Sequence, residues 1–189
     1  MTIHDDTKPL RVHLVGASGS GTTYVGRALA KELGCALIDT DSIFWLPTIP
    51  PFQRYREEQD RQQLLVDVVE AHERCVITGS LCGWGDVIIS LLDLVVFLIV
   101  PTAVRLERLK RRELKHFGAE ALAPGGEMHE SYTKFMEWSA SYDEGGMEIR
   151  SRMKHETWLA QLNCPLLRLE GEGTLESLLD EILRAIGEL

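Results

Sequence analysis

A glycine-rich segment near the start of the chain constrains its fold more than any other feature. Residues 10–23 have the sequence LRVHLVGASGSGTT, in which an apolar run ends at Gly16 and Gly21 stands before a segment of helical periodicity. Glycine permits positive φ and lets backbone amides approach an anion closely, and the start of a helix carries a partial positive charge. This spacing between a strand and a helix predicts a loop that binds phosphate.

One position of this loop departs from the usual pattern, in which Gly21 would be followed by Lys and then by Ser or Thr. Thr22 stands at the Lys position and Thr23 fills the last one. The lysine normally offsets negative charge on the outer phosphates during transfer. Without it, we expect either that another cation of the protein offsets this charge or that transfer is slow. The residues expected to bind the nucleotide are Gly16, Ala17, Ser18, Gly19, Ser20, Gly21, Thr22 and Thr23, and the Thr23 hydroxyl is also a candidate ligand for Mg²⁺.

The rest of the chain alternates strand-like apolar runs with helical patterns. This alternation predicts an α/β fold of three layers, in which a five-stranded parallel sheet has helices on both faces. Ligands bind at the carboxyl ends of the strands in such sheets, so the residues that follow each strand are the informative ones. Strands are expected at 10–15, 36–38, 75–78, 94–100 and 166–169, and helices at 21–33, 57–73, 101–116, 131–141, 148–162 and 175–186.

Charge and composition narrow the possible partners. The 189 residues include 20 basic and 29 acidic side chains, for a net charge of −9, which argues against a nucleic-acid or anionic membrane surface. The longest apolar run, 91–100, is too short to span a bilayer, and the first eight residues do not resemble a signal peptide. The four cysteines lack paired spacing, so we expect reduced thiols in a cytoplasmic protein, either a monomer or a homodimer.

Two carboxylates close the second expected strand. Residues two apart on a strand face the same side, so Asp39 and Asp41 are both expected to face the site. Asp39 could hold Mg²⁺ through water, and Asp41 could accept a proton from the attacking oxygen or orient it. The alternative is a turn in which an aspartate caps the end of the strand.

Arginines on the helix expected after residue 101 are the candidates to replace the missing lysine. Arg105, Arg108 and Arg112 recur on one helical face, and guanidinium groups suit the oxygens of a phosphoryl group in transfer. The alternative is a solvated face whose arginines pair with neighbouring glutamates. Arg150 is a further catalytic candidate; on the helix expected over 148–162 it diverges from Arg152, so only one of the two can face the site.

Together, these segments resemble the P-loop kinases of the nucleoside-monophosphate kinase and shikimate kinase branch. The resemblance lies in the loop at 16–23, the Asp-Thr-Asp sequence at 39–41 and the Val-Pro-Thr segment that leads to Arg105 and Arg108. The chain is also similar to bacterial adenylate-kinase-like ATP-binding proteins, which share the Gly-Ser-Gly-Thr-Thr loop. Archaeal-type cytidylate kinases resemble it in having this loop without lysine.

The resemblance implies the three-layer P-loop NTPase fold as a single domain over 1–189. Its core would comprise 9–39, 74–112 and 163–189, with an acceptor-binding insert at about 40–73 and an arginine-bearing lid at about 113–150. It also implies ATP and Mg²⁺ as cofactors, with adenine near 171–174. Adenylate kinases carry Asp-Gly-Phe-Pro-Arg after the third strand and shikimate kinases a glycine triplet, whereas this chain has Thr-Gly-Ser-Leu-Cys at 78–82, so the acceptor stays open.

Three functions are therefore in view. The first is an ATP-dependent phosphotransferase that acts on a nucleoside monophosphate. The second is a kinase for a small hydroxylated metabolite. The third, favoured by Thr22, is a protein that binds or slowly hydrolyses ATP without an acceptor.

Overall fold

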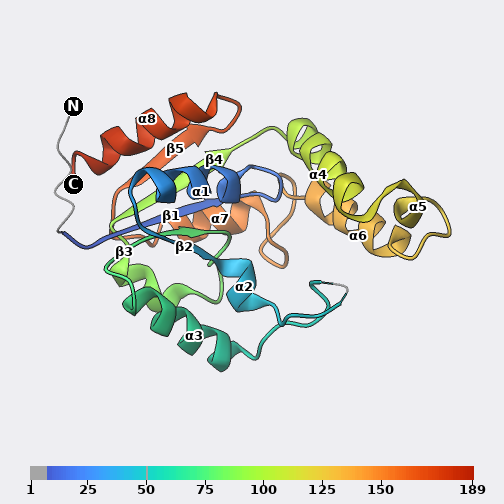
Figure 1. Ribbon diagram of the computed structural model, residues 1–189, viewed down its shortest axis with the longest axis horizontal. Coiled ribbons are helices and arrows are strands. Elements are labelled where there is room, and N and C mark those ends of the chain that lie inside the picture. The colour runs from blue at the N-terminus through green and yellow to red at the C-terminus, as the bar shows by residue number, and fades with distance from the viewer. Residues whose placement is uncertain (1–7, 50) are drawn as a thin grey trace.

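The sheet has five parallel strands in the order β2-β3-β1-β4-β5 (Figure 1). This computed structural model describes residues 8–49 and 51–189. The order places β1 at the centre, so the loop that follows it lies in the middle of the carboxyl edge. The prediction of an α/β fold with five parallel strands is confirmed. The strands are β1 (Leu10–Gly16), β2 (Ala36–Asp39), β3 (Arg74–Thr78), β4 (Leu94–Ile99) and β5 (Leu166–Glu170).

Helices cover both faces of the sheet because its central strands are apolar on both sides. In β4, Val96 packs in one core with α1 (Thr22–Glu32) and α8 (Leu175–Ile186). Its neighbour Phe97 packs in the other core with α3 (Glu58–Glu70) and α7 (Arg152–Leu159). A short 3-10 helix, η1 (Asp86–Leu91), belongs to this second layer.

Two segments extend beyond the sheet on the side of its carboxyl ends (Figure 1). One comprises α4 (Thr102–Phe117), α5 (Ala119–Leu122) and α6 (His129–Ala140). The other begins with α2 (Thr40–Phe44) and continues into an arm, in which Trp45 pairs with Tyr55 in an antiparallel bridge. The loop after β1 therefore lies at an edge that is flanked by two projections.

Helix α1 lies close against β3 because Gly26 has no side chain. A Cβ atom at this position would stand 2.2 Å from Thr78 Cγ2. This close approach sets the distance between α1 and β3.

Two segments of the predicted site fold differently from the expectation, and side-chain caps are the reason. Asp39 ends β2 and accepts a hydrogen bond from the Asp41 amide, so Asp41 lies in the first turn of α2 and not on the strand. The expected helix over 148–162 begins only at Arg152, because Ser151 Oγ accepts from the Lys154 amide and caps α7 there. Arg150 is therefore not helical, and the argument from helical divergence does not apply to it.

No helix within residues 8–49 and 51–189 is both long enough and apolar enough to cross a membrane. The four cysteines, Cys35, Cys75, Cys82 and Cys164, are free thiols.

Candidate active site

The loop at residues 16–23, hereafter the P-loop, has glycines where side chains have no room. A Cβ atom on Gly16 would lie 2.5 Å from Ser20 Oγ and 2.8 Å from the Leu98 carbonyl oxygen. A Cβ atom on Gly19 would lie 2.7 Å from the Arg105 carbonyl oxygen. Gly19 and Gly21 also have φ angles of 83° and 97°, which favour glycine. The loop is therefore a tight backbone turn against β4 and α4.

The start of α1 suits an anion. Its N-cap, Gly21, provides no side-chain hydrogen bond, and the first turn holds no acidic residue. The amides of this turn thus have no side-chain acceptor, and the helix adds a partial positive charge. Within the described part of the chain, the buried Ser20 hydroxyl also has no hydrogen-bond partner. Together with the turn at Gly19 and Gly21, these donors fit a phosphate group.

Arg105 is fully buried, with 0% of its surface exposed, and its guanidinium is held on every side. Nε donates to the Val100 carbonyl at 3.1 Å, and Nη1 to the carbonyls of Ser18 and Ser139, both at 3.2 Å. Nη2 donates to Thr102 Oγ1 at 2.8 Å and to the Asp143 carboxylate at 3.2 Å. An arginine side chain has five N–H donors, so none remains for a phosphate in this structure. Arg105 joins the P-loop to α4 and to the end of α6.

The other two arginines of the predicted face of α4, Arg108 and Arg112, have exposed side chains. Arg108 donates from Nη1 to the Ser20 carbonyl at 3.2 Å and from Nη2 to the Gly171 carbonyl at 3.1 Å, which joins the P-loop to the turn after β5. Arg112 pairs with its neighbour Glu113 at 2.7 Å and stacks over the Phe135 ring. The predicted face of α4 therefore divides into one buried arginine and two at the surface of the site.

Asp39 and Asp41 lie close together, although not through strand alternation. Asp39 Oδ1 accepts from the Asp41 amide at 3.1 Å, so one oxygen serves as the cap of α2. The Asp41 carboxyl reaches solvent but is surrounded by protein, and this burial raises its pKa above the usual value. The charge of Asp39 raises it further, whereas Arg150 and Arg112 oppose the shift. The site thus brings two carboxylates and two cations within electrostatic reach of each other.

Arg150 reaches the site from the segment between α6 and α7. Burial lowers the pKa of its guanidinium from the usual value, and the charge of Asp41 is the largest opposing effect. The guanidinium lies 5.4 Å from the centre of the Trp138 ring. Arginine keeps its proton at neutral pH, so Arg150 is a cation beside Asp41.

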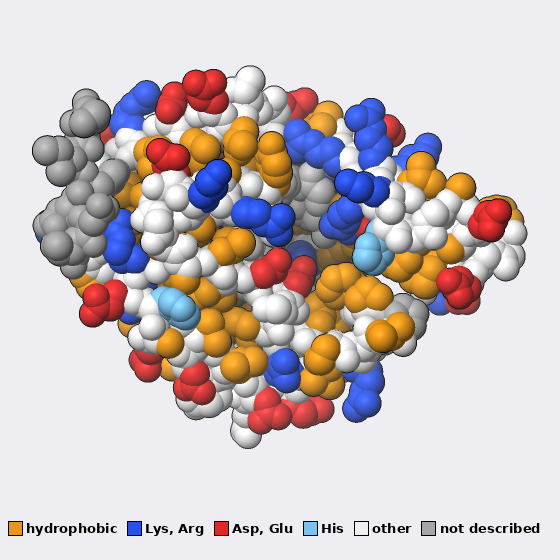
Figure 2. Space-filling model, viewed as in Figure 1, with side chains coloured by type: hydrophobic (Ala, Val, Ile, Leu, Met, Phe, Trp, Pro, Cys, Tyr) orange, Lys and Arg blue, Asp and Glu red, His pale blue; other side chains and the backbone are white. Residues whose placement is uncertain are grey.

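Figure 2 shows a hollow in this face of the molecule, between the start of α1, the α4–α6 projection and α2. Lysine and arginine side chains gather along its upper rim, and acidic side chains lie at its lower edge. This distribution matches a phosphate donor on the P-loop side and carboxylates on the side of α2.

The loop after β3 is held by buried groups that the sequence analysis did not single out. His13 Nε2 lies 2.9 Å from the Gly79 carbonyl, and Ser80 Oγ lies 3.1 Å from His155 Nε2. Burial lowers the pKa of His13 to about 4 and that of His155 to about 3, so both rings are neutral at pH 7. Scattered histidines carry no periodic signal, and only the fold shows that both contact the loop after β3.

Arg61 is a second residue that the sequence analysis missed. Its guanidinium lies 4.6 Å from the centre of the Phe44 ring and 5.8 Å from that of Trp84. The side chain is 12% exposed, and Nη1 donates to the Arg56 carbonyl. This cation lies between one aromatic ring of the predicted acceptor insert, Phe44, and one ring of the loop after β3, Trp84. No signal in the sequence marked it, because arginines are common on exposed helices.

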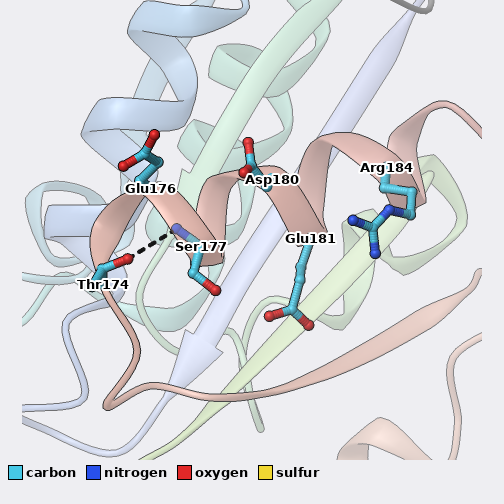
Figure 3. Close-up of a pocket in the computed structure, with 6 residues that line it drawn as sticks. All are labelled: Thr174, Glu176, Ser177, Asp180, Glu181 and Arg184. Atoms are coloured by element: carbon cyan, nitrogen blue, oxygen red, sulfur yellow. Dashed lines mark hydrogen bonds between the residues drawn. The ribbon is translucent and has the colours of Figure 1, made fainter.

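A shallow recess along α8 provides a contrast (Figure 3). Its acidic lining does not suit a nucleotide phosphate, and it contains no residue of the P-loop. The lining residues are Thr174, Glu176, Ser177, Asp180, Glu181 and Arg184.

The parallel sheet, the glycine turn after β1 and the arginines of α4 define a P-loop protein of the kinase type. The chain belongs to the AAA domain family, whose model matches residues 12–120. It is 43% identical over 172 residues to a Bacillus subtilis protein described as uncharacterized protein YqaC, covering 91% of this chain and 94% of that protein.

Relatives with a stated activity are kinases. The chain is 30% identical over 117 residues to the cytidylate kinase of Archaeoglobus fulgidus, covering 56% of this chain and 63% of that enzyme. It thus spans less than two thirds of that relative. The structure of a shikimate kinase from Acinetobacter baumannii in complex with shikimate superposes with a TM-score of 0.57 at 21% identity, covering 96% of this chain and 94% of that one. These findings confirm the predicted P-loop kinase class; the roles of individual site residues stay predictions.

Replacing Arg105 by Lys should destabilise the fold, because one compact ammonium cannot replace five donors that point in different directions. We expect the free energy of unfolding to fall by roughly 2–4 kcal/mol, since buried carbonyls and the Asp143 carboxylate lose their partners. Urea denaturation measures this change. The control Arg112→Lys, at an exposed position, should shift stability by less than about 0.5 kcal/mol. Equal urea midpoints for the two variants would contradict the assigned role.

Stability should decrease as the pH falls from about 6.5 to about 4. The unfolded chain binds a proton at His13 near pH 6.5, whereas the folded chain resists it down to about pH 4. The stabilisation is therefore complete above pH 6.5 and lost toward pH 4, and the share of His13 is roughly 1–3 kcal/mol. In His13→Phe this part of the pH dependence should disappear from urea titrations, whereas the exposed control His72→Gln should keep it. Parallel curves for wild type and His13→Phe would refute the assignment.

Proposed function

We propose that this chain is a Mg²⁺-dependent phosphotransferase that moves the γ-phosphate of ATP to a small acceptor, in the manner of nucleoside-monophosphate kinases. The observation that carries the proposal is the position of Asp41. Its carboxyl lies in the first turn of α2, directly after the carboxyl end of β2, and has a raised pKa on which the charges of Arg150 and Arg112 act. A carboxylate with a raised pKa is better matched to accept a proton near neutral pH than an ordinary aspartate.

The donor would bind at the P-loop. The amides at the start of α1 and the Ser20 hydroxyl, which has no partner among the described residues, would donate to phosphate oxygens. Thr23 Oγ1 and the second carboxylate oxygen of Asp39 are the groups that would hold Mg²⁺, which offsets charge on the phosphates when bound. No group of three or more His, Cys, Asp or Glu residues in the described part of the chain could hold a metal by itself. The nucleotide oxygens would therefore supply most of the ligands.

The charge that Lys normally supplies would come from Arg112 and Arg150. Both influence Asp41 and both lie outside the P-loop, so they would act from the acceptor side of the transferred group. Arg105 would hold the site together and not contact the phosphate, because its donors are used in joining the P-loop to α4 and α6. Arg108 would fix the turn after β5, where the base of the nucleotide is expected.

The acceptor would bind between α2, α3 and the loop after β3. Arg61, which lies over the rings of Phe44 and Trp84, would form one wall of this site, and Arg150 would contribute a second cation. Arg150 has no carboxylate within ion-pair distance among the described residues, so an anionic group on the acceptor would find an unpaired cation. Cytidylate, shikimate and gluconate all carry such a group and represent both classes of acceptor.

A protein that binds ATP without an acceptor is the second candidate, and Thr22 favours it. The two candidates differ in one measurable property. A phosphotransferase releases ADP faster when its acceptor is present, whereas a binding or hydrolysing protein does not.

Purified protein with ATP and Mg²⁺ should release ADP in a manner that depends on one member of an acceptor panel. The panel holds nucleoside monophosphates, shikimate, gluconate and nucleosides, and mass spectrometry identifies the phosphorylated product. If ATP binds tightly but no acceptor changes the rate of ADP release, the phosphotransferase is excluded and a protein that binds ATP without an acceptor is supported. If ATP does not bind, both fail.

Asp41→Asn should lower kcat by about 10²–10⁴-fold, because it removes the proton acceptor, and leave the Kd for ATP within about twofold. In wild type the rate should fall as the pH drops through the raised pKa of Asp41, and this acid limb should vanish in the variant. Asp67→Asn, on the exposed side of α3, is the matched control and should retain full activity. A kcat for Asp41→Asn above half of the wild-type value would exclude Asp41 as the base.

A further inference from the structure

The segment that carries Arg150 is a closed loop between α6 and α7. Its two ends meet where the Arg152 amide donates to the Tyr142 carbonyl at 2.8 Å. Inside the loop, the buried Ser151 hydroxyl donates to the Gly146 carbonyl at 2.6 Å and accepts from the Lys154 amide. The position of Arg150 therefore depends on how the base of this loop is held.

His155 holds that base through two side-chain hydrogen bonds. Its Nδ1 lies 2.8 Å from the Tyr142 hydroxyl and its Nε2 lies 3.1 Å from the Ser80 hydroxyl. The imidazole is 0% exposed, and Tyr142 and Ser80 are each 6% exposed. A neutral imidazole has one N–H and one lone pair, so the proton arrangement at one nitrogen fixes that at the other. The three side chains form one buried chain of hydrogen bonds.

The far end of this chain reaches the carboxylate side of the hollow. Ser80 follows Gly79, and a Cβ atom on Gly79 would lie 2.1 Å from the Thr40 hydroxyl, between Asp39 and Asp41. At the other end, the Tyr142 ring lies 5.0 Å from the Arg105 guanidinium, which donates to Ser18 of the P-loop. The chain thus connects the segment of Asp41, the loop of Arg150 and the P-loop.

We propose that His155 is a positioning residue, which acts through Ser80 and Tyr142 to set the Arg150 loop at the correct distance from Asp41. The proposal rests on the proposed function, because it assigns the effect of the chain to catalysis by Arg150. If His155 only filled space in the core, its imidazole would need no polar partners. Burying this imidazole with the hydroxyls of Tyr142 and Ser80 costs free energy unless all of their hydrogen bonds form. Such a network specifies one geometry among several that apolar packing would allow.

The experiment compares Tyr142→Phe and Ser80→Ala in two backgrounds, wild type and Arg150→Gln. Each substitution removes a single hydroxyl and keeps the surrounding packing, so the variants should fold. In the wild-type background each should lower kcat about ten- to a hundredfold, the usual effect of displacing a catalytic group by about 1 Å, with KM for ATP unchanged within about twofold. In the Arg150→Gln background the same substitutions should change kcat by less than about twofold, because their effect passes through Arg150.

The control is Thr157→Ala on the exposed face of α7, which should leave kcat unchanged in both backgrounds. Equal losses of kcat with and without Arg150 would overturn the proposal and leave a structural role for His155. So would a loss that appears only in KM for ATP.

A second measurement separates this proposal from the proposed function. Arg150 lies over Trp138, so the NMR resonances of the Arg150 Nε–H and the Trp138 indole N–H report its position without turnover. Both should shift in Tyr142→Phe and stay in place in Thr157→Ala. Shifted resonances in a protein that transfers no phosphate would refute the proposed function alone. Unshifted resonances in an active enzyme would refute the positioning role alone.

Discussion

The buried guanidinium of Arg105 is the interaction on which the geometry of the site depends. A fully desolvated cation is tolerated only when its donors and its charge are satisfied, and here carbonyls of three different segments and the Asp143 carboxylate do so. The P-loop, the start of α4 and the end of α6 must therefore keep their mutual positions, or this charge is left without partners. The P-loop is thus held in place by contacts that lie outside its own glycines.

The elements that the sequence predicted well are those governed by local rules. The P-loop, α1 and the apolar runs of β1 and β4 follow from short-range periodicity and glycine spacing, and they lie within one or two residues of the expected bounds. The conformation just after β2 was harder to predict, because a side-chain cap competes with strand continuation over two residues. Asp39 stops the strand and turns Asp41 into α2, so the two carboxylates meet through a turn that strand alternation cannot describe.

The remaining features depend on contacts between segments far apart in the chain. Arg105 and Arg108 share one helical face in the sequence, yet Arg105 is enclosed by α6 and the P-loop while Arg108 stays at the surface. His155 meets Ser80 across 75 residues, and no property of either residue in the sequence marks the pair. Long-range packing decides which polar side chain is buried and satisfied, so these roles could be assigned only from the structure.

The absence of lysine from the P-loop changes how the proposed reaction would be controlled. A lysine at position 22 would carry its charge on α1, beside the phosphates whether or not an acceptor is present. Arg112 and Arg150 instead belong to α4 and to the loop before α7, and Arg150 depends on hydrogen bonds that end at the acceptor side of the site. Under the proposed function, the cations that offset charge in the transition state would reach full effect only when the acceptor side is correctly arranged. A water molecule would make none of the acceptor's contacts, so such a distribution of charge would disfavour hydrolysis of ATP relative to transfer.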